Sequence, residues 1–404
     1  MRILHFIDNG FEAGGAEKLV RLVSEGLTAR GHVNRVVATD RMADGERVFA
    51  DDLVPAITGS GPRRLARKLW YARGRRQAGA VLEAFRPDCV HLHCTSEFSP
   101  SLFAATAGYP RVLSVQGPED WTLGLLRWQL TGAPAGERLS ASDLARYGCL
   151  RFVQRPAYLP RVRRVDRILV PSRYFARAVA RDAGPVPVHV VPNGIERKTP
   201  PRPLTTADHV VVAGRLVQGK GVGVLLEAMR RLLPRHPSAR LTVVGDGPYR
   251  PALESAAADL VAARRARFRG WLGEAEVLDC LGDAAVVAVP SLWPENFPTV
   301  ALEALQVGRP LVASRVGGLP ELVGPDNGVL VPAGDPVRLA GALGGLLGRP
   351  GVLERMGAAS AVRAERYGIG EFLDALEHHY RQAAAHHHRR QAQGLPDPRG
   401  AARS

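Results

Sequence analysis

VVAVPSLWPENFPTVALE, residues 286–303, is the stretch that indicates the fold class. It begins with a short apolar run, continues through a proline-containing loop and enters a helical pattern at Thr299. We interpret it as a buried parallel strand, a loop and a helix, which together form the repeating unit of an α/β domain. Glu295 then lies in the loop at the carboxyl end of the strand, where open α/β sheets bind ligands, and Glu303 lies in the helix.

These two glutamates are candidate ligand-binding residues. An ionised carboxylate accepts hydrogen bonds through two oxygens, and the hydroxyls of a sugar or a ribose are donors. The alternative is that Glu295 and Glu303 are solvated side chains on a surface helix, because this spacing arises freely. The neighbouring motifs decide between the two interpretations.

Three glycine-rich turns precede this stretch, each after an apolar strand pattern. The first, VVVAGRLVQGKG at 210–221, places Arg215 and Lys220 before a long amphipathic helix. A forked guanidinium, an ammonium group and a helix N-terminus suit a diphosphate. The other two turns are TVVGDGP at 242–248 and FRGWL at 268–272.

In this order, the motifs resemble the C-terminal half of the family 4 retaining glycosyltransferases. The resemblance is close over roughly residues 165–340 and looser elsewhere, and it continues through Gly308–Pro310 and Val316–Glu321. The residues that carry it are Gly214, Arg215, Lys220, Gly245, Asp246, Gly247, Pro248, Gly270, Trp271, Leu272, Pro290, Ser291, Glu295 and Glu303.

The resemblance implies the fold and the reaction. The expected fold is GT-B, an α/β fold in which two Rossmann-like parallel-sheet domains face each other across a cleft and a C-terminal helix crosses back to the N-terminal domain. The expected reaction is transfer of a hexose-type sugar, with retained anomeric configuration, from a nucleoside-diphosphate donor. Uridine diphosphate is the first expectation for the donor nucleotide. The acceptor would be a hydroxyl of a glycan, a lipid-linked glycan or a natural product, and neither a metal nor a cofactor is expected.

The resemblance also implies roles for individual residues. Arg215 and Lys220 would stabilise the departing diphosphate, which makes them catalytic together with Glu295, and Glu303 would hold the ribose. Glu295 would hold sugar hydroxyls with the backbone N–H groups of the residues that follow it. The expected donor-binding set is Gly14, Gly15, Gly214, Arg215, Lys220, Gly245, Leu272, Glu295, Asn296, Phe297, Thr299 and Glu303.

The N-terminal half supplies weaker signals. Gly14 and Gly15 follow the first strand pattern and open a helix, so their backbone can approach an anion. The resemblance places His93, Gln116 and Glu119 on the acceptor side. Family members commonly carry a histidine where this chain has Gln116, and glutamine cannot titrate, which puts a general-base role there in doubt.

Histidines suggest two further sites. His91 and His93 share one face of a strand, which is the geometry of two metal ligands as well as of a cleft wall. No third ligand lies nearby in the sequence, so we expect no metal. The triple histidine 386–388 is interpreted as tail composition rather than as a metal site.

The chain length of 404 residues and the alternating strand and helix patterns predict two domains. The expected segments are an acceptor-side domain at 1–195, a proline-rich linker at 196–207, a nucleotide-sugar-binding domain at 208–350, C-terminal helices at 351–383, the last packing on the N-terminal domain, and a disordered tail at 384–404.

Composition predicts the compartment. The first residues form a strand pattern rather than a secretory leader, and the four cysteines, without paired metal spacing, fit a reducing compartment. We expect a cytoplasmic protein, in peripheral contact with the inner face of the membrane if its basic segment binds lipid.

The net charge of +15 raises the question of an anionic partner. Residues 63–76 combine seven arginine and lysine residues with leucines and aromatics. Three interpretations remain: a solvated helix face, an amphipathic contact with an anionic membrane, and, with least support because no nucleic-acid module is present, a nucleic-acid site.

Two rival functions remain beside the transferase: a sugar-nucleotide-binding or epimerising relative of the same fold, and a basic binding protein for membranes or nucleic acid.

Overall fold

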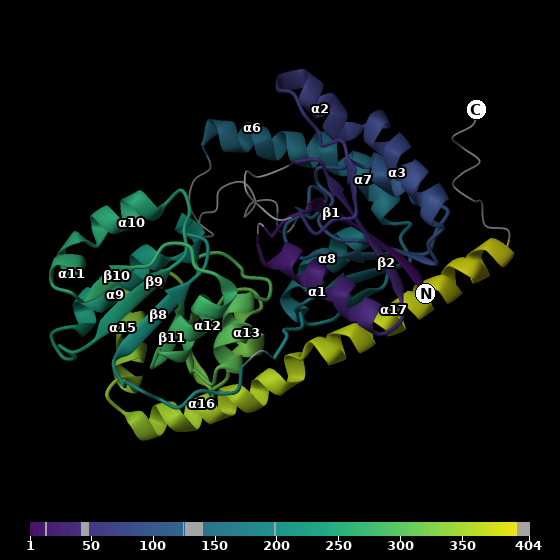
Figure 1. The fold of residues 1–404 in the computed structure, drawn as a ribbon. Helices are drawn as coiled ribbons and strands as arrows, with labels where there is room; N and C mark the ends of the chain where they lie inside the picture. Colours follow the sequence, from purple (N-terminus) through teal and green to yellow (C-terminus); the bar gives the residue numbers. More distant parts are fainter. Residues whose placement is uncertain (13, 42–47, 124, 126–139, 198, 394–404) are drawn as a thin grey trace. The chain divides into compact units, whose positions relative to one another are not determined.

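The computed structural model describes residues 1–12, 14–41, 48–123, 125, 140–197 and 199–393. The chain divides into two compact units (Figure 1). The first unit combines the N-terminal residues up to Gly194 with the C-terminal residues from Ile369, and the second unit contains Ile195–Gly368. Each unit is an α/β domain with a parallel sheet, as the alternating patterns predicted.

The first unit contains a seven-stranded parallel sheet in the order β3-β2-β1-β4-β5-β6-β7. The strands are β1 (Arg2–Asn9), β2 (Val33–Thr39), β3 (Asp52–Val54), β4 (Cys89–Leu92), β5 (Arg111–Ser114), β6 (Arg167–Val170) and β7 (Val188–Val190). The helical elements are α1 (Gly15–Ala29), α2 (Gly61–Leu69), α3 (Ala72–Phe85), α4 (Ser101–Ala105), α6 (Ala141–Cys149), the π-helix η1 (Leu150–Gln154), α7 (Arg155–Val162), α8 (Arg173–Ala183) and α17 (Ile369–Ala392).

Alternate residues of β1 are buried on opposite faces of this sheet. Leu4 and Phe6 join a core with α3, α7 and α8, whereas Ile3 joins a core with α1 and α17. The C-terminal helix α17 lies along α1 in Figure 1 and contributes Leu376 and Tyr380 to that second core. The last helix therefore packs on the N-terminal unit, as the sequence predicted.

The end of α17 corrects one expectation. We expected a disordered tail from residue 384, but the helix continues to Ala392, and residues 394–404 lie outside the described part of the chain. Alanines are strong helix formers, and His386 Nδ1 lies 3.1 Å from Asp166 Oδ1, so both propensity and a tertiary contact extend the helix. The histidines 386–388 therefore belong to this helix.

The second unit contains a six-stranded parallel sheet in the order β10-β9-β8-β11-β12-β13. The strands are β8 (His209–Ala213), β9 (Arg240–Val244), β10 (Ala266–Phe268), β11 (Val286–Val289), β12 (Leu311–Ser314) and β13 (Gly328–Val331). The helical elements are the 3-10 turn η2 (Gln218–Lys220), α9 (Val222–Leu232), α10 (Arg250–Ala256), α11 (Ala258–Ala262), α12 (Glu274–Gly282), α13 (Thr299–Gln306), α14 (Leu319–Leu322), α15 (Pro336–Leu346), α16 (Pro350–Ala364) and the 3-10 turn η3 (Glu365–Tyr367).

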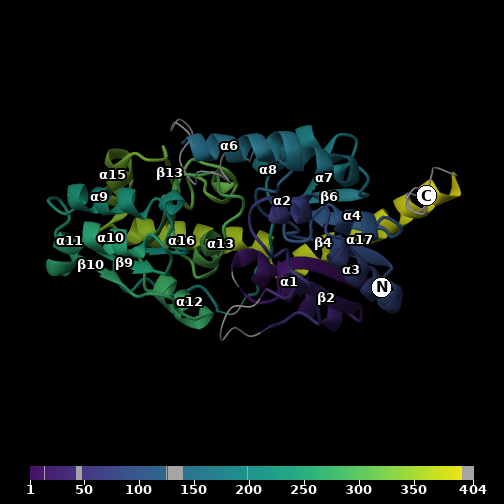
Figure 2. The same ribbon diagram turned by 90° about the horizontal axis from the view of Figure 1, so that it is seen from above.

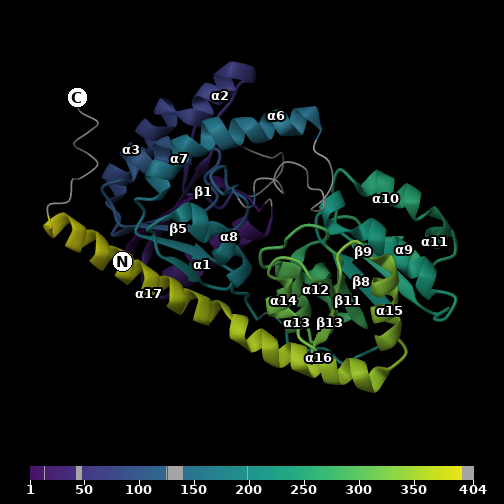
Figure 3. The same ribbon diagram turned by 180° about the vertical axis from the view of Figure 1, so that it is seen from behind.

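Helices cover both faces of the second sheet. Val210 and Val212 of β8 pack with α9 and α15, and Val211 packs with α12 and α13. Figure 2 shows α9 and α15 on one side of β9 and α12 on the other. Figure 3 shows α13 and α14 near β13, on the face that contains Val211. Because both faces are covered, these strands read as continuous apolar runs rather than as alternating ones.

We expected residues 196–207 to be a linker, but the described residues 199–207 contact the second unit. Arg309 is buried, and its guanidinium donates to the carbonyl oxygens of Arg202 and Pro203 at 2.8 Å each. Arg202 also pairs with Asp279 of α12 at 2.6 Å. These contacts explain why the division between the units falls at Gly194 and Ile195, before this segment. None of the described helices has the length and apolar character that crossing a bilayer requires.

Candidate functional site

In the second unit, the loops that carry the predicted donor-binding residues follow the carboxyl ends of neighbouring strands. The loops after β8 and β11 are adjacent because these strands pair in the sheet. Glycines allow the two loops to touch: a Cβ on Gly221, whose φ is +69°, would lie 1.9 Å from the carbonyl oxygen of Pro290. A Cβ on Gly219 would lie 2.1 Å from the ring of Trp293, and Leu292 N–H donates to the Gly219 oxygen at 2.8 Å.

Lys220 and Glu295 meet at this contact. The Lys220 ammonium donates to Glu295 Oε1 at 2.7 Å, and the same oxygen accepts from Ser291 Oγ at 2.6 Å and from Trp293 Nε1 at 3.0 Å. Glu295 is buried, with 7% of its surface exposed. Burial alone would disfavour the carboxylate, but the charge of Lys220 and the three hydrogen bonds lower the pKa of Glu295 below its usual range. Glu295 is therefore a preorganised carboxylate.

Ser291 and Trp293 were not among the predicted site residues. The Lys220 ammonium also lies 5.8 Å from the centre of the Trp293 ring, within the range of a cation–π contact. Their signal in the sequence was their position directly before Glu295 in the same loop. Sequence reasoning assigned Lys220 and Glu295 separate roles and did not foresee their ion pair.

Arg215 lies on the turn after β8, where its side chain is exposed. No hydrogen bond or ion pair joins its guanidinium to a residue within the described ranges. The turn depends on Gly214 and Gly245: a Cβ on Gly245, whose φ is +120°, would lie 2.0 Å from the Gly214 oxygen. Gly214 N–H in turn donates to the Val244 carbonyl at 3.0 Å. The close approach of these backbones holds the Arg215 turn beside the loop after β9.

The remaining predicted donor residues occupy the start of α13. Asn296 and Phe297 are buried, and the Phe297 ring packs against Tyr367 at 5.3 Å between centres, so a ligand would meet its backbone rather than its ring. Thr299 begins α13, whose first N–H groups have no intrahelical partner. Glu303 lies one turn further and is half-buried.

A second glycine turn supports the backbone of Glu295. Gly318 N–H donates to the Glu295 carbonyl at 2.7 Å, and a Cβ on Gly317, whose φ is +56°, would lie 1.9 Å from that oxygen. Leu272 is half-buried against the apolar core that contains Phe297, whereas Trp271 beside it is 76% exposed. Trp271 belongs to the FRGWL motif but was not predicted as a site residue, although an exposed indole after β10 can stack on a base.

In the first unit, Gly14 is the N-cap of α1 and Gly15 its first residue, and both are exposed. Glu17 in the first turn is buried and accepts a hydrogen bond from Asn9 Nδ2 at 3.0 Å. The first turn of α1 is thereby joined to the end of β1. The approach of an anion to this exposed helix N-terminus stays a prediction.

His93 belongs to a buried cluster of three histidines. His93 Nε2 lies 3.2 Å from His5 Nδ1, and the ring centres of His91 and His93 are 3.8 Å apart. His91 is engaged at both nitrogens, by Tyr380 Oη and Ser114 Oγ, at 2.7 Å each. The sequence did not reveal His5 as a neighbour, because only the register of β1 and β4 places His5 beside His91.

This cluster could be mistaken for a metal centre, since one ring nitrogen from each histidine lies within 4.8 Å of the others. Burial lowers the pKa of His5 to about 4 and the pKa values of His91 and His93 well below 6.5, so the rings are neutral. Overlapping rings do not direct their in-plane lone pairs at one point, and His91 already uses both nitrogens. We therefore interpret the cluster as a packed polar layer. The expectation that it binds no metal stays a prediction.

Gln116 and Glu119 lie in the loop after β5. Gln116 exchanges two amide hydrogen bonds with Asn193, each 3.1 Å long. Glu119 is 4% exposed, and burial, followed by the charges of Asp8 and Asp120, raises its pKa well above the usual range. Glu119 is therefore protonated at neutral pH and can donate a hydrogen bond.

Asp8, at the carboxyl end of β1, was missed. Its carboxylate accepts from the backbone N–H groups of Ser96 and Glu97 at 3.1 and 2.9 Å and from Ser96 Oγ at 2.8 Å. Burial raises its pKa to about 7, despite these hydrogen bonds. A carboxyl group that titrates near neutrality at a strand end is a candidate for proton transfer. Its signal in the sequence was an acidic residue where the first strand pattern stops.

The motifs and the fold agree with comparisons to known proteins. A family model described as Glycosyltransferase Family 4 matches residues 13–198, and one described as Glycosyl transferases group 1 matches residues 207–349. The chain is 34% identical over 299 residues to the MMP alpha-(1->4)-mannosyltransferase of Mycolicibacterium hassiacum, which covers 71% of this chain and 69% of that protein.

Two further comparisons extend over more of the chain. The glycogen synthase of Mycobacterium tuberculosis is 28% identical over 382 residues, which is 87% of this chain and 86% of that protein. The solved structure of sucrose-phosphate synthase from Thermosynechococcus elongatus is similar with a TM-score of 0.73 at 21% identity, covering 95% of this chain and 99% of that one. The latter similarity concerns the fold alone.

Proposed function

This chain belongs to the family 4 glycosyltransferases, with the GT-B fold, and we propose that it transfers a hexose-type sugar from a nucleoside-diphosphate donor to an acceptor hydroxyl, with retention and without a metal. Its relatives are named as glycosyltransferases and sugar-polymer synthases, so the rival binding-protein functions gain no support. The observation that carries the proposal is the ion pair of Lys220 and Glu295 beside the exposed Arg215 turn.

The donor diphosphate would bind between the loops after β8 and β11. Arg215 offers a guanidinium that is free of described partners, and Lys220 retains N–H donors besides the one that it gives to Glu295. As the glycosidic bond breaks, negative charge grows on the departing diphosphate, and fixed cations stabilise that charge most where water is excluded. In this proposal, the two side chains supply the stabilisation for which other enzymes use a metal ion.

Glu295 would orient the transferred sugar. Ser291, Trp293 and Lys220 already fix the position of its carboxylate. The Glu295 side chain therefore loses little conformational entropy when it accepts hydrogen bonds from sugar hydroxyls. Glu303 would bind the ribose one turn into α13. We propose uridine diphosphate as the first donor nucleotide to test, because it is the commonest in the family that the motifs indicate.

On the acceptor side, we propose Asp8 and the protonated Glu119 as hydrogen-bonding groups, together with Gln116 and His93. A glycan, a lipid-linked glycan or a natural product presents the hydroxyls that such groups recognise. Because Asp8 titrates near neutrality, it is better suited to exchange a proton than Gln116.

The basic segment 63–76 suits a peripheral contact with an anionic membrane. Helix α2 has no buried residue, and Trp70 is 38% exposed, with Arg75 and Arg161 at 5.4 and 5.0 Å from its ring. Co-sedimentation with vesicles that contain 30% anionic lipid tests this idea. We expect binding that salt weakens. Equal binding to vesicles without anionic lipid would contradict an electrostatic contact.

Thermal-shift measurements with UDP, GDP, ADP and their sugar conjugates test the donor proposal, because a ligand that binds only the folded protein raises its melting temperature. We expect one nucleotide series to stabilise the parent and to lose its effect in Arg215→Ala. Arg338→Ala is the matched control, because Arg338 is an exposed arginine on α15 of the same unit. An equal loss in both variants, or no shift with any nucleotide, would refute the donor site.

A further inference from the structure

The second unit has a cavity away from the donor loops, at the amino ends of its strands. Its volume is about 740 Å³, within the range of small-molecule pockets. His209 and Arg240 begin β8 and β9, and Arg264 and Arg265 form the turn that precedes β10. The loops after β8 and β11 leave the opposite, carboxyl edge of the same sheet, so this cavity is separate from the candidate donor site.

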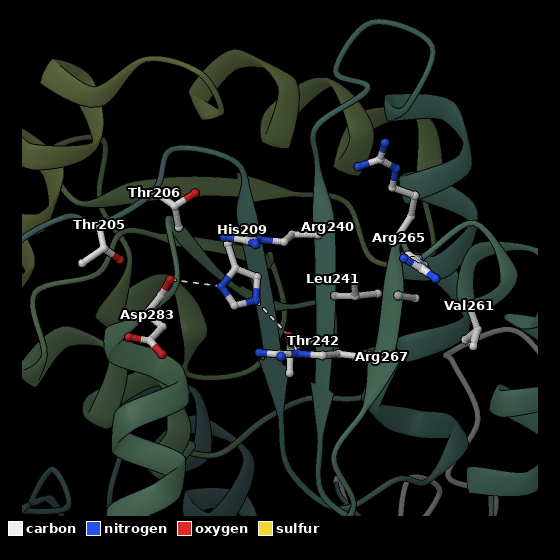
Figure 4. A pocket seen from close by; sticks show the side chains of 12 residues that line it. Thr205, Thr206, His209, Arg240, Leu241, Thr242, Val261, Arg265, Arg267 and Asp283 are labelled. Carbon is white, nitrogen blue, oxygen red and sulfur yellow. Dashed lines mark hydrogen bonds between the residues drawn. The ribbon is translucent and has the colours of Figure 1, made fainter.

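The sheet register brings four polar side chains of this cavity to one face. Arg240 pairs with His209, and Thr242 pairs with Arg267 in the next strand, so all four point to the face covered by α12. Figure 4 shows Arg240 and Arg267 extending from their strands toward His209 and Thr242. Asp283, at the end of α12, closes the other side.

A chain of hydrogen bonds fixes the floor of the cavity. His209 Nδ1–H donates to the Asp283 carbonyl at 3.0 Å, so Nε2 accepts from the Thr242 hydroxyl at 2.8 Å. That hydroxyl oxygen in turn accepts from Arg267 Nε at 2.9 Å, which leaves the two terminal nitrogens of the guanidinium directed away from the floor. Burial, along with the charges of Arg240 and Arg267, lowers the pKa of His209, so the histidine is neutral. The positive charge of the cavity comes from its arginines.

Nearby carboxylates balance only part of the charge of these arginines. Beyond the lining, hydrogen bonds from Ser238 and Thr206, together with the charge of Arg240, lower the pKa of Asp208. Arg240, Arg264, Arg265 and Arg267 face a single lining carboxylate, that of Asp283. Within the described ranges, none of the four guanidinium groups forms an ion pair at salt-bridge distance. Other arginines of this unit do: Arg230 pairs with Asp259 at 2.7 Å. The cavity therefore keeps an excess of positive charge where a concave wall strengthens its attraction for anions.

We propose that this cavity binds a small phosphorylated molecule, such as a sugar phosphate or another phosphate ester. Planar guanidinium forks hydrogen-bond phosphoryl oxygens in pairs, and Arg240 and Arg267 present two forks on one face. Val261, which is 44% exposed, gives the carbon skeleton an apolar contact at one side of the cavity. Among the described lining residues none is phenylalanine, tyrosine or tryptophan, and His209 is held in the floor by its two hydrogen bonds, so the cavity lacks the exposed stacking platform typical of single-stranded nucleic-acid sites.

Calorimetric titration with inorganic pyrophosphate in 0.15 M NaCl tests this site. We expect the parent protein to bind pyrophosphate with a dissociation constant below about 1 mM. In the double variant Arg240→Gln/Arg267→Gln, the affinity should fall by about tenfold or more. In Arg338→Gln/Arg355→Gln, the affinity should not change. The control pair removes the same charge from exposed positions on α15 and α16. All four positions are exposed, so the variants should fold, which circular dichroism checks.

Pyrophosphate also resembles the donor diphosphate, so Arg215→Gln separates the two sites. Binding that persists in Arg215→Gln and is lost in Arg240→Gln/Arg267→Gln supports the cavity. Loss in Arg215→Gln alone, or equal loss in the control pair, overturns the proposal. A single-stranded 12-mer oligonucleotide that binds more tightly than pyrophosphate through Arg240 and Arg267 also overturns it. UDP binding, which reports on the donor site, should be unchanged in Arg240→Gln/Arg267→Gln.

Discussion

Replacing Lys220 by alanine removes the charged partner of a buried carboxylate, Glu295. Coulomb's law with an effective dielectric constant of about 20 gives roughly 6 kcal/mol for two unit charges 2.7 Å apart. The desolvation of both groups on folding offsets most of this attraction. Since Lys220 keeps a quarter of its side chain exposed and Ser291 and Trp293 still donate to Glu295, we expect Lys220→Ala to destabilise the protein by about 2 kcal/mol, as for a charge-assisted hydrogen bond.

A double-mutant cycle isolates this interaction. Glu295→Gln keeps an oxygen that can accept from Ser291 and Trp293 but removes the charge, so Lys220→Ala should cost much less in a Glu295→Gln background. The free energy of unfolding from urea denaturation, followed by tryptophan fluorescence, should yield a coupling of about 1–2 kcal/mol. As a control, Arg231→Ala breaks an exposed pair with Glu227 and should cost less than about 1 kcal/mol.

The same pair predicts a pH dependence. Because the folded-state pKa of Glu295 is below its unfolded value of about 4.3, the pair contributes stability above that value and loses it as the pH falls through the lower folded-state pKa. Lys220→Ala should reduce this acid-dependent part of the unfolding free energy. Turnover should also fall by on the order of a hundredfold, if Lys220 stabilises the departing diphosphate. A coupling under about 0.5 kcal/mol, with turnover retained, would refute both the electrostatic and the catalytic reasoning.

Two further variants probe the rest of the described sites. Asp8 has a folded-state pKa of about 7, above its unfolded value near 4, so the folded state binds the proton of this carboxyl group more tightly. The parent protein should therefore lose stability as the pH rises from about 4 to 7. Asp8→Asn should flatten that loss in melting curves, and an unchanged slope would show that another group causes it. Gly221→Ala should destabilise the protein by about 1–3 kcal/mol and reduce donor binding, because its methyl group meets the Pro290 carbonyl at a positive φ. Unchanged nucleotide binding in Gly221→Ala would mean that the contact between the loops does not shape the site.

The sequence predicted the parts of the fold that depend on local pattern. Apolar runs bounded by glycine marked the strands, and alternating helices required them to be parallel. The end of α17 escaped prediction because a run of alanine and histidine has no apolar periodicity, and its helix also depends on the contact of His386 with Asp166, a residue 220 positions away. The proline-rich composition of residues 196–207 likewise predicts a linker, and no local pattern reveals that Arg309 donates to the carbonyl oxygens of Arg202 and Pro203.

For the sites, sequence motifs identified residue types but not their partners. Lys220 and Glu295 are 75 positions apart, and their contact follows from the pairing of β8 with β11, which no local pattern reveals. Protonation states were equally hidden. Asp8 and Glu119 have ordinary pKa values in an unfolded chain, and only burial beside other carboxyl groups raises them.

The two candidate sites of the second unit differ in how their cations are compensated, and this difference has a chemical consequence. At the donor loops, Lys220 is held by Glu295, so its position is fixed before a ligand arrives and its charge is partly balanced. Fixed, partly balanced cations can stabilise charge that develops during a reaction without binding the ground-state anion too tightly. At the amino ends of the strands, Arg240 and Arg267 form no salt bridge with a described carboxylate, which favours binding a stable anion rather than a transition state. The first arrangement suits catalysis, and the second suits recognition.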